Sequence, residues 1–177
     1  SLKANLNNNI FINLDSTYKV KDYNYGISGK LEKVKFKLLK PIKNSLIDKE
    51  IKEIYFSDLQ IKTIFDPKNI SLVAEGKYSL NNLDFLKVNL ENNFNNNLAN
   101  LKLDFDYENS LELDVINYKK SKNSIANLSL NLKKKKDNIE ISKLNFEEGN
   151  NSIKINGLSF KDNKFLSFKK IEVVTKN

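Results

Sequence analysis

The side chains of this chain that could perform chemistry are almost all carboxylates and lysine amines. The sequence contains no Cys, His, Met or Trp, and it also contains no Arg, so all 30 basic residues are Lys. This composition excludes a thiolate nucleophile, a histidine base and a histidine-ligated metal. The absence of Cys also excludes a disulfide scaffold, and it leaves the redox compartment open.

Asp104 and Asp106 are the residues that most resemble a catalytic pair. Paired carboxylates can serve glycoside hydrolysis or bind Ca²⁺. Both residues alternate with Leu103, Phe105 and Tyr107, which places the two carboxylates on the polar face of a strand. No loop with ligand spacing and no partner acid or base accompanies them. We therefore expect a solvated strand face, a protein that is not an enzyme, and neither cofactor nor metal.

The second chemical feature is the positive charge, which includes four consecutive lysines at 133–136 and a net charge of +8. Such a charge could attract nucleic acid or anionic lipid. However, Lys, Asn and Ile all have AT-rich codons, and Asn alone makes up roughly one residue in six, several times its normal share. Nucleic-acid binding would also need exposed aromatic residues. Most Tyr and Phe here instead occupy the same alternate positions as Leu and Ile, which directs them to the apolar side of the strands. We expect a solvated turn and no nucleic-acid partner.

The elements that carry these residues are strands, because apolar and polar residues alternate along most of the chain. Leu101, Leu103, Phe105 and Tyr107 form the clearest run. About ten such runs recur every 10–14 residues, which is typical of an all-β protein. Turn compositions at 65–69, 107–110, 133–138 and 147–151 separate consecutive runs. Short connections of this kind predict a meander of antiparallel neighbours.

At several points, within or between runs, the apolar residues switch from odd to even residue numbers or the reverse. Leu31 is followed by Val34, Phe56 is followed by Leu59, and Phe85 is followed by Val88. A slip of one residue inside a strand predicts a β-bulge or a strong bend. We therefore expect a strongly curved sheet.

One segment, residues 45–53, departs from the strand pattern. Leu46, Ile47 and Ile51 have helical spacing, and Ser45 with Asp48 resembles a capping box. The segment is predicted as a short helix or, equally, as a strand entered through an irregular loop.

The fold class predicted from these patterns is all-β, with one long, strongly curved antiparallel meander sheet that is open and groove-like. A sheet with one apolar face can also close as a sandwich, and periodicity does not separate the two. The chain begins without Met, and its pattern starts and stops in mid-course. This predicts that residues 1–177 are a single segment of a larger repetitive β-groove protein. No apolar run approaches the ~18 residues of a membrane span.

Three passages carry a family resemblance: "LVAEGKYSLNNLDFLKVNLEN" at 72–92, "LELDVINYKKSKNSIANLSLNLKK" at 111–134 and "NSIKINGLSFKDNKFLSFKKIEVVTKN" at 151–177. Their sequence of strand, turn and strand resembles the repetitive β-rich region of the AsmA-like family of bacterial envelope proteins (the YhdP and TamB type). The resemblance covers most of residues 70–177 and is weaker over 1–65.

The resemblance implies a long, open β-groove that is anchored in the inner membrane through a part of the protein not present here. The groove would lie in the periplasm of a diderm bacterium with an AT-rich genome. It would transport phospholipid between the inner and outer membranes and support outer-membrane integrity. Its partners would be phospholipid acyl chains and neighbouring β-repeat segments of the same chain.

The candidate lipid-binding residues are the apolar members of the alternating runs, which either line a groove or pack in a core. They are Tyr25, Ile27, Phe36, Phe56, Ile61, Leu72, Tyr78, Phe85, Leu101, Leu103, Phe105, Leu113, Val115, Leu128, Leu130, Ile141, Phe146, Ile155, Phe160, Phe168 and Ile171. The alternative function is a structural or adhesive β-repeat module in which the same face forms a closed core.

Overall fold

The structure is a computed structural model that describes residues 3–43, 50–113, 116–122, 124–162 and 164–175. Within these residues, eleven strands form one antiparallel sheet, and two form a separate ribbon. The strands are β1 (Lys3–Leu14), β2 (Val20–Ile42), β3 (Ile51–Phe65), β4 (Asn69–Ser79), β5 (Leu86–Asn95), β6 (Leu98–Tyr107), β7 (Leu111–Leu113), β8 (Tyr118–Lys120), β9 (Ala126–Lys135), β10 (Asn138–Glu148), β11 (Asn151–Lys161), β12 (Lys164–Ser167) and β13 (Lys170–Val174).

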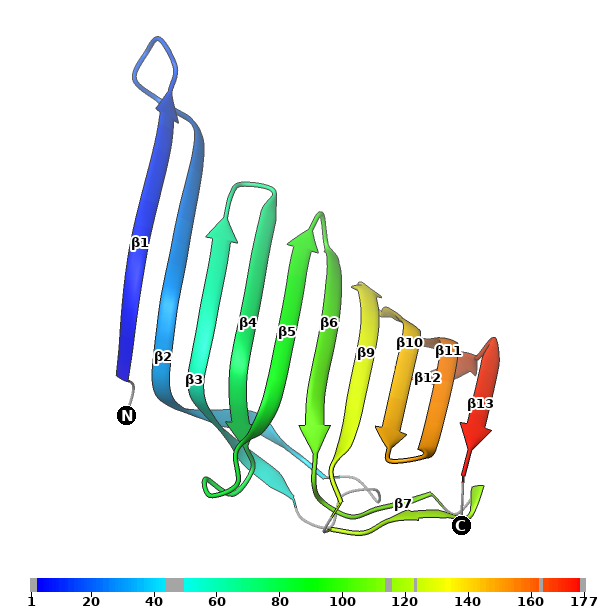
Figure 1. The fold of residues 1–177 in the computed structure, drawn as a ribbon. Coiled ribbons are helices and arrows are strands. Elements are labelled where there is room, and N and C mark those ends of the chain that lie inside the picture. The colour runs from blue at the N-terminus through cyan, green and yellow to red at the C-terminus, as the bar shows by residue number, and fades with distance from the viewer. Residues whose placement is uncertain (1–2, 44–49, 114–115, 123, 163, 176–177) are drawn as a thin grey trace.

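The sheet is a meander with one interruption, and it does not close into a barrel. Strands β1 to β6 follow one another, β9 then pairs with β6, and β10 and β11 continue the series (Figure 1). The ribbon of β7 and β8 leaves the sheet between β6 and β9. Strands β12 and β13 both pair with β11, along different parts of its outer edge. The predicted curved, open, antiparallel meander is therefore confirmed.

Register places the apolar residues of successive strands directly opposite one another, and opposite residues share a face. One row crosses ten strands in the order Leu6, Gly29, Ile61, Ala74, Leu90, Leu103, Leu130, Leu144, Ile155 and Ile171. The adjacent row on the other face runs Asn7, Ser28, Lys62, Val73, Glu91, Lys102, Asn131, Lys143, Asn156 and Lys170. We call these two surfaces the apolar face and the polar face.

Bulges keep the apolar residues on one face where the sequence changes parity. The pairing of β3 with β4 shifts between Ser57 and Gln60, and Asp58 has a φ of 53°. Phe56 and Leu59 therefore both lie on the apolar face, as the slip predicted. The slip between Phe85 and Val88 has another cause, because Phe85 belongs to the connection between β4 and β5.

Two expectations about elements need correction. For the segment 45–53, the helical alternative is wrong over its last residues and the strand alternative holds there, since Ile51, Lys52 and Glu53 begin β3; residues 44–49 lie outside the described residues. The run from Leu111 to Val115 does not add a strand to the meander. Its described part, Leu111–Leu113, pairs with β8 in the ribbon, because the chain leaves the sheet after Tyr107, the last residue of β6.

At Gly29 the backbones of β1 and β2 lie so close together that there is no room for a side chain. Its φ is +148°, and a Cβ there would lie 2.1 Å from the Asn5 carbonyl oxygen. We predict that Gly29→Ala destabilises the β1–β2 pair by about 2 kcal/mol or more, because strained backbone and steric overlap add. Faster hydrogen exchange of the β1 amides measures the effect.

Gly26→Ala is the matched control in the same strand. A Cβ at Gly26 would meet only ordinary contacts, with Thr63 O at 3.9 Å and Asn9 O at 4.0 Å. This variant should keep wild-type exchange. Equal exchange rates in the two alanine variants would contradict the register of β1 on β2.

Candidate functional site

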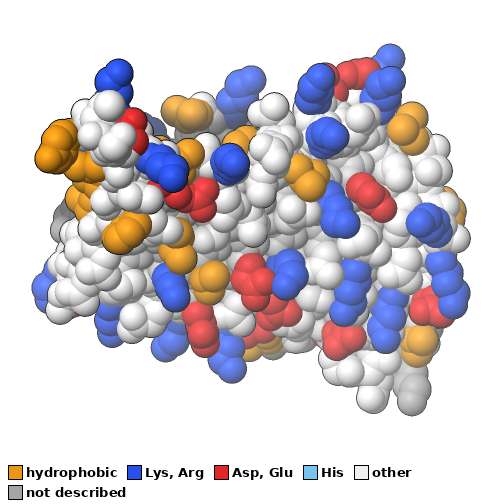
Figure 2. All heavy atoms as spheres, turned by 90° about the horizontal axis from the view of Figure 1, so that it is seen from above, with side chains coloured by type: hydrophobic (Ala, Val, Ile, Leu, Met, Phe, Trp, Pro, Cys, Tyr) orange, Lys and Arg blue, Asp and Glu red, His pale blue; other side chains and the backbone are white. Residues whose placement is uncertain are grey.

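The candidate site is the apolar face itself, because no second layer covers most of it within the described residues. The chain exposes 12765 Å², whereas a compact monomer of 20.5 kDa exposes roughly 8,800 Å². Most apolar side chains of the central strands are half-buried rather than buried. Figure 2 shows hydrophobic side chains that reach the surface among the lysines. The sheet therefore presents its apolar face to solvent.

Register brings most of the predicted residues together on this face. They are Tyr25, Ile27, Phe36, Phe56, Ile61, Leu72, Tyr78, Leu101, Leu103, Phe105, Leu128, Leu130, Ile141, Phe146, Ile155, Phe160 and Ile171. Tyr78 and Phe146 are buried, whereas Phe36 and Ile171 are exposed.

Three predicted residues lie elsewhere, and a fourth is not among the described residues. Phe85 lies in the β4–β5 connection, and Phe168 lies between β12 and β13. Leu113 belongs to the ribbon, and Val115 lies outside the described residues. The alternation of side chains could not place Phe85, Phe168 and Leu113, because each of these three lies where the chain leaves the meander.

A buried cluster supports the apolar face at β3, β4 and β5. It contains Leu59, Ala74, Tyr78 and Val88. The Tyr78 ring meets the Phe105 ring edge to face with centroids 5.8 Å apart, and the Tyr78 hydroxyl donates to the Asp106 carbonyl oxygen at 2.6 Å. Burial raises the pKa of Tyr78. This hydroxyl is a structural anchor that stays protonated.

The ribbon covers one end of the apolar face, the end at which β4 and β6 terminate, which is lowest in Figure 1. We call it the covered end. Tyr118 of β8 packs edge to face on Phe146 with centroids 5.6 Å apart. Ala126 and Ile153 complete this second buried cluster. The ribbon therefore gives a single sheet a local second layer.

Lys120 holds the ribbon in place from inside. Its side chain is fully buried, and its Nζ donates to the carbonyl oxygens of Glu108 and Asn109, at 2.9 and 3.0 Å, and of Ser121 and Ser124. It thus joins the segment that leaves the sheet to the segment that returns. Burial lowers the pKa of Lys120, while Glu148 and Glu108 oppose that shift. Sequence reasoning missed this lysine because nothing distinguishes it among 30.

Glu148 adds an acidic partner to the same cluster. The Tyr118 hydroxyl donates to its carboxylate. Burial raises the pKa of Glu148, but hydrogen bonds from Ser124, Tyr118 and Asn151, with the charge of Lys120, outweigh it and hold the pKa below its ordinary value of 4.5.

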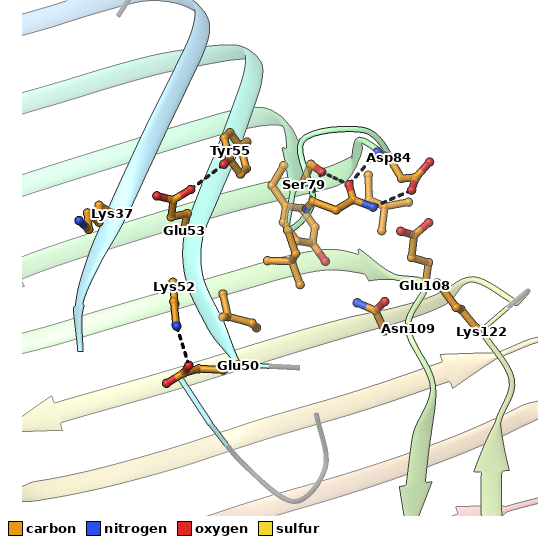
Figure 3. Close-up of a pocket in the computed structure, with 15 residues that line it drawn as sticks. Lys37, Glu50, Lys52, Glu53, Tyr55, Ser79, Asp84, Glu108, Asn109 and Lys122 are labelled. Carbon is orange, nitrogen blue, oxygen red and sulfur yellow. Dashed lines mark hydrogen bonds and ion pairs between the residues drawn. The ribbon is translucent and has the colours of Figure 1, made fainter. Parts of the chain in front are cut away.

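A pocket of about 650 Å³ lies beside the covered end. The lower parts of β2 and β3 supply Lys37 and Tyr55, the end of β4 supplies Tyr78 and Ser79, and the following loop supplies Asp84 (Figure 3). Its charged residues have both signs: Glu50, Glu53, Asp84, Glu108, Lys37, Lys52 and Lys122. The pocket offers polar surroundings next to the apolar residues Tyr78, Leu80 and Leu86.

The acidic pair on the polar face is held by an amide. Asn127 Nδ2 donates to Asp104 Oδ1 at 3.2 Å and to Asp106 Oδ1 at 3.3 Å. Among the described residues, no group of three or more acidic side chains could hold a metal ion, and no helix has the length and apolar character to cross a membrane.

Comparisons with protein-family models, with curated proteins and with solved structures find no match to this chain. The resemblance to the AsmA-like family thus remains an expectation from sequence, and the geometry of the apolar face carries the functional argument.

Lys120→Met should detach the ribbon, because four partly buried carbonyl oxygens lose their donor. Unsatisfied buried groups cost on the order of 1–3 kcal/mol each, with partial relaxation, so we predict fast proteolysis within residues 108–125. Lys119→Met is the matched control, since the adjacent Lys119 side chain is exposed. Equal cleavage of both variants would contradict the anchoring role of Lys120.

Acid should also release the ribbon. Because the folded pKa of Glu148 is lowered, its contribution to stability is present above about pH 4.5 and is lost as pH falls through the folded value. The protection factors of the β8 amides, which correct exchange rates for their intrinsic pH dependence, should fall in that window. Glu148→Gln should remove this dependence, and Glu147→Gln, an exposed change on the same strand, should retain it.

Proposed function

We propose that this chain is a non-enzymatic, lipid-binding groove segment that carries phospholipid acyl chains on its apolar face. The observation that carries the proposal is the apolar face that crosses ten strands, over most of which the described residues place no second layer. A monomeric soluble protein rarely exposes an apolar surface of this extent unless the surface binds something. Acyl chains fit such a surface because they need apolar contact and no hydrogen bonds.

The energetics support this ligand class. Each methylene group removed from water contributes about 0.8 kcal/mol, so one acyl chain along a strand of ten residues, roughly 33 Å long, gains several kcal/mol. Half-buried Leu90, Leu103 and Leu130 offer contact without the desolvation cost of polar groups. The pocket of mixed charge beside the covered end supplies polar surroundings for a head group.

The setting that we propose is the bacterial envelope. Together with the family resemblance of residues 70–177, a one-sided open sheet supports a segment of an AsmA-like protein that moves phospholipid between inner and outer membranes through the periplasm. The alternative, a structural or adhesive module, needs a closed core. The described residues supply cover for that core only at the covered end.

Photo-crosslinking tests the proposal directly. A photoreactive phenylalanine analogue replaces Phe105 or Leu130, which lie on the apolar face of β6 and β9. The folded variants are mixed with vesicles of phosphatidylethanolamine and phosphatidylglycerol and then irradiated. We predict covalent phospholipid adducts, detected by intact-protein mass spectrometry.

Asp104 and Ser129 give the matched controls, because each precedes a probe position and lies opposite the other on the polar face. The analogue at these positions should form no adduct. The proposal fails if folded variants with probes at Phe105 and Leu130 label no lipid, or if all four positions label equally.

A further inference from the structure

Strand β1 forms one edge of the sheet, and its outer side faces solvent. β2 pairs with β1 from Lys3 to Leu14, and no described strand pairs with the opposite side. All twelve residues of β1 are exposed. A strand directs half of its N–H and C=O groups away from its one neighbour, so this edge is a template for another strand.

The sequence of β1 lacks the features that protect sheet edges. From Ala4 to Leu14 it contains no charged residue, no Pro and no Gly, in a chain with 30 lysines. The opposite edge is different, because β12 and β13 have only four and five residues and begin with Lys164 and Lys170. Short strands and lysines block edge pairing. Among the described residues, the sheet thus has one protected edge and one edge suited to pairing.

The hairpin of β1 and β2 also projects beyond its neighbours (Figure 1). β3 pairs with β2 only from Tyr25 onward. Ile10, Phe11 and Ile12 are 69%, 67% and 53% exposed. Figure 2 shows hydrophobic side chains grouped at the left, where this hairpin lies. A two-stranded hairpin is marginally stable alone. A further strand that pairs along β1 would therefore stabilise the projecting part of this hairpin.

We propose that β1 pairs antiparallel with β1 of a second copy of this chain, about a two-fold axis at Asn9. Pairing must join residues of equal parity, because a slip of one residue would place apolar side chains against the polar face. With Asn9 opposite itself, Ile12 lies opposite Leu6 of the other copy, and Leu14 lies opposite its Ala4. Each projecting tip is then flanked by the lower half of the other β1.

The charges at the ends of β1 favour this orientation. In the antiparallel register Lys3 comes beside Asp15 of the other copy, whereas parallel pairing brings Lys3 beside Lys3, and like charges opposite each other are unfavourable. The pair would join two apolar faces into one continuous surface. The lipid proposal rests on the face of the sheet, so self-association at its edge is tested separately. A second copy and a neighbouring β-repeat segment of the same chain are alternative occupants of the β1 edge, and we propose the second copy.

Single cysteines test the register cleanly, because the native chain has none. Asn9→Cys should form a disulfide-linked dimer under mild oxidation, since directly opposite residues of antiparallel strands lie within bonding range. The reaction should be at least roughly tenfold faster than for Lys102→Cys, an exposed residue of central strand β6, because paired strands hold the thiols at high effective concentration.

Light scattering completes the test. The wild-type chain should have the mass of a dimer, and Ile10→Lys with Ile12→Lys should give a monomer with unchanged circular dichroism, since both side chains are exposed already. A wild-type monomer, or Asn9→Cys that crosslinks no faster than Lys102→Cys, would overturn the proposal. Preferential crosslinking of Asn9→Cys to Val173→Cys would also overturn it, because that result indicates head-to-tail pairing of β1 with β13.

Discussion

The structure depends on keeping every apolar side chain on one face of a single sheet. Side chains alternate between the two faces of a strand, so any extra residue would turn the rest of that strand over. The bulge at Asp58 absorbs the extra residue between Phe56 and Leu59. β10 has a similar shift between Ile141 and Lys143, which keeps Ile141 and Leu144 on the same face. These irregularities preserve the apolar rows across the sheet.

A single sheet with one apolar face must be stabilised without a second layer along its length. Two buried clusters provide this stabilisation locally. One cluster packs around Tyr78, where aromatic rings of β4 and β6 meet above β5. The other is the ribbon, which Lys120 ties down from within. Between these supports the face stays half-exposed, and that arrangement leaves room for a ligand of low polarity.

Sequence alone predicted the meander and most of the apolar face, because both follow from alternation, which Leu101, Leu103, Phe105 and Tyr107 display most clearly. The open form was favoured by the changes of parity, and alternation by itself fits a closed sandwich equally well. The slips before Val34 and Leu59 marked two register shifts, one in the pairing of β1 with β2 and one in the pairing of β3 with β4. Alternation could not reveal the ribbon, since Leu111 and Leu113 alternate in β7 as they would in the sheet. It could not reveal Lys120 or Glu148 either. Their roles arise from contacts between segments separated in sequence, as between Lys120 and Glu108, and their residue types are common throughout the chain.

The most direct measurement of the central claim is methyl NMR of the chain with a phospholipid that carries a nitroxide on its acyl chain. The account predicts selective broadening of the methyl signals of Leu90, Leu103 and Leu130 on the apolar face. Val73 is the internal reference, because it lies on the polar face between Lys62 and Glu91 and is 49% exposed. Its signal should stay sharp. Equal broadening of Val73 and the leucines, or no broadening of either, would contradict a lipid-binding apolar face.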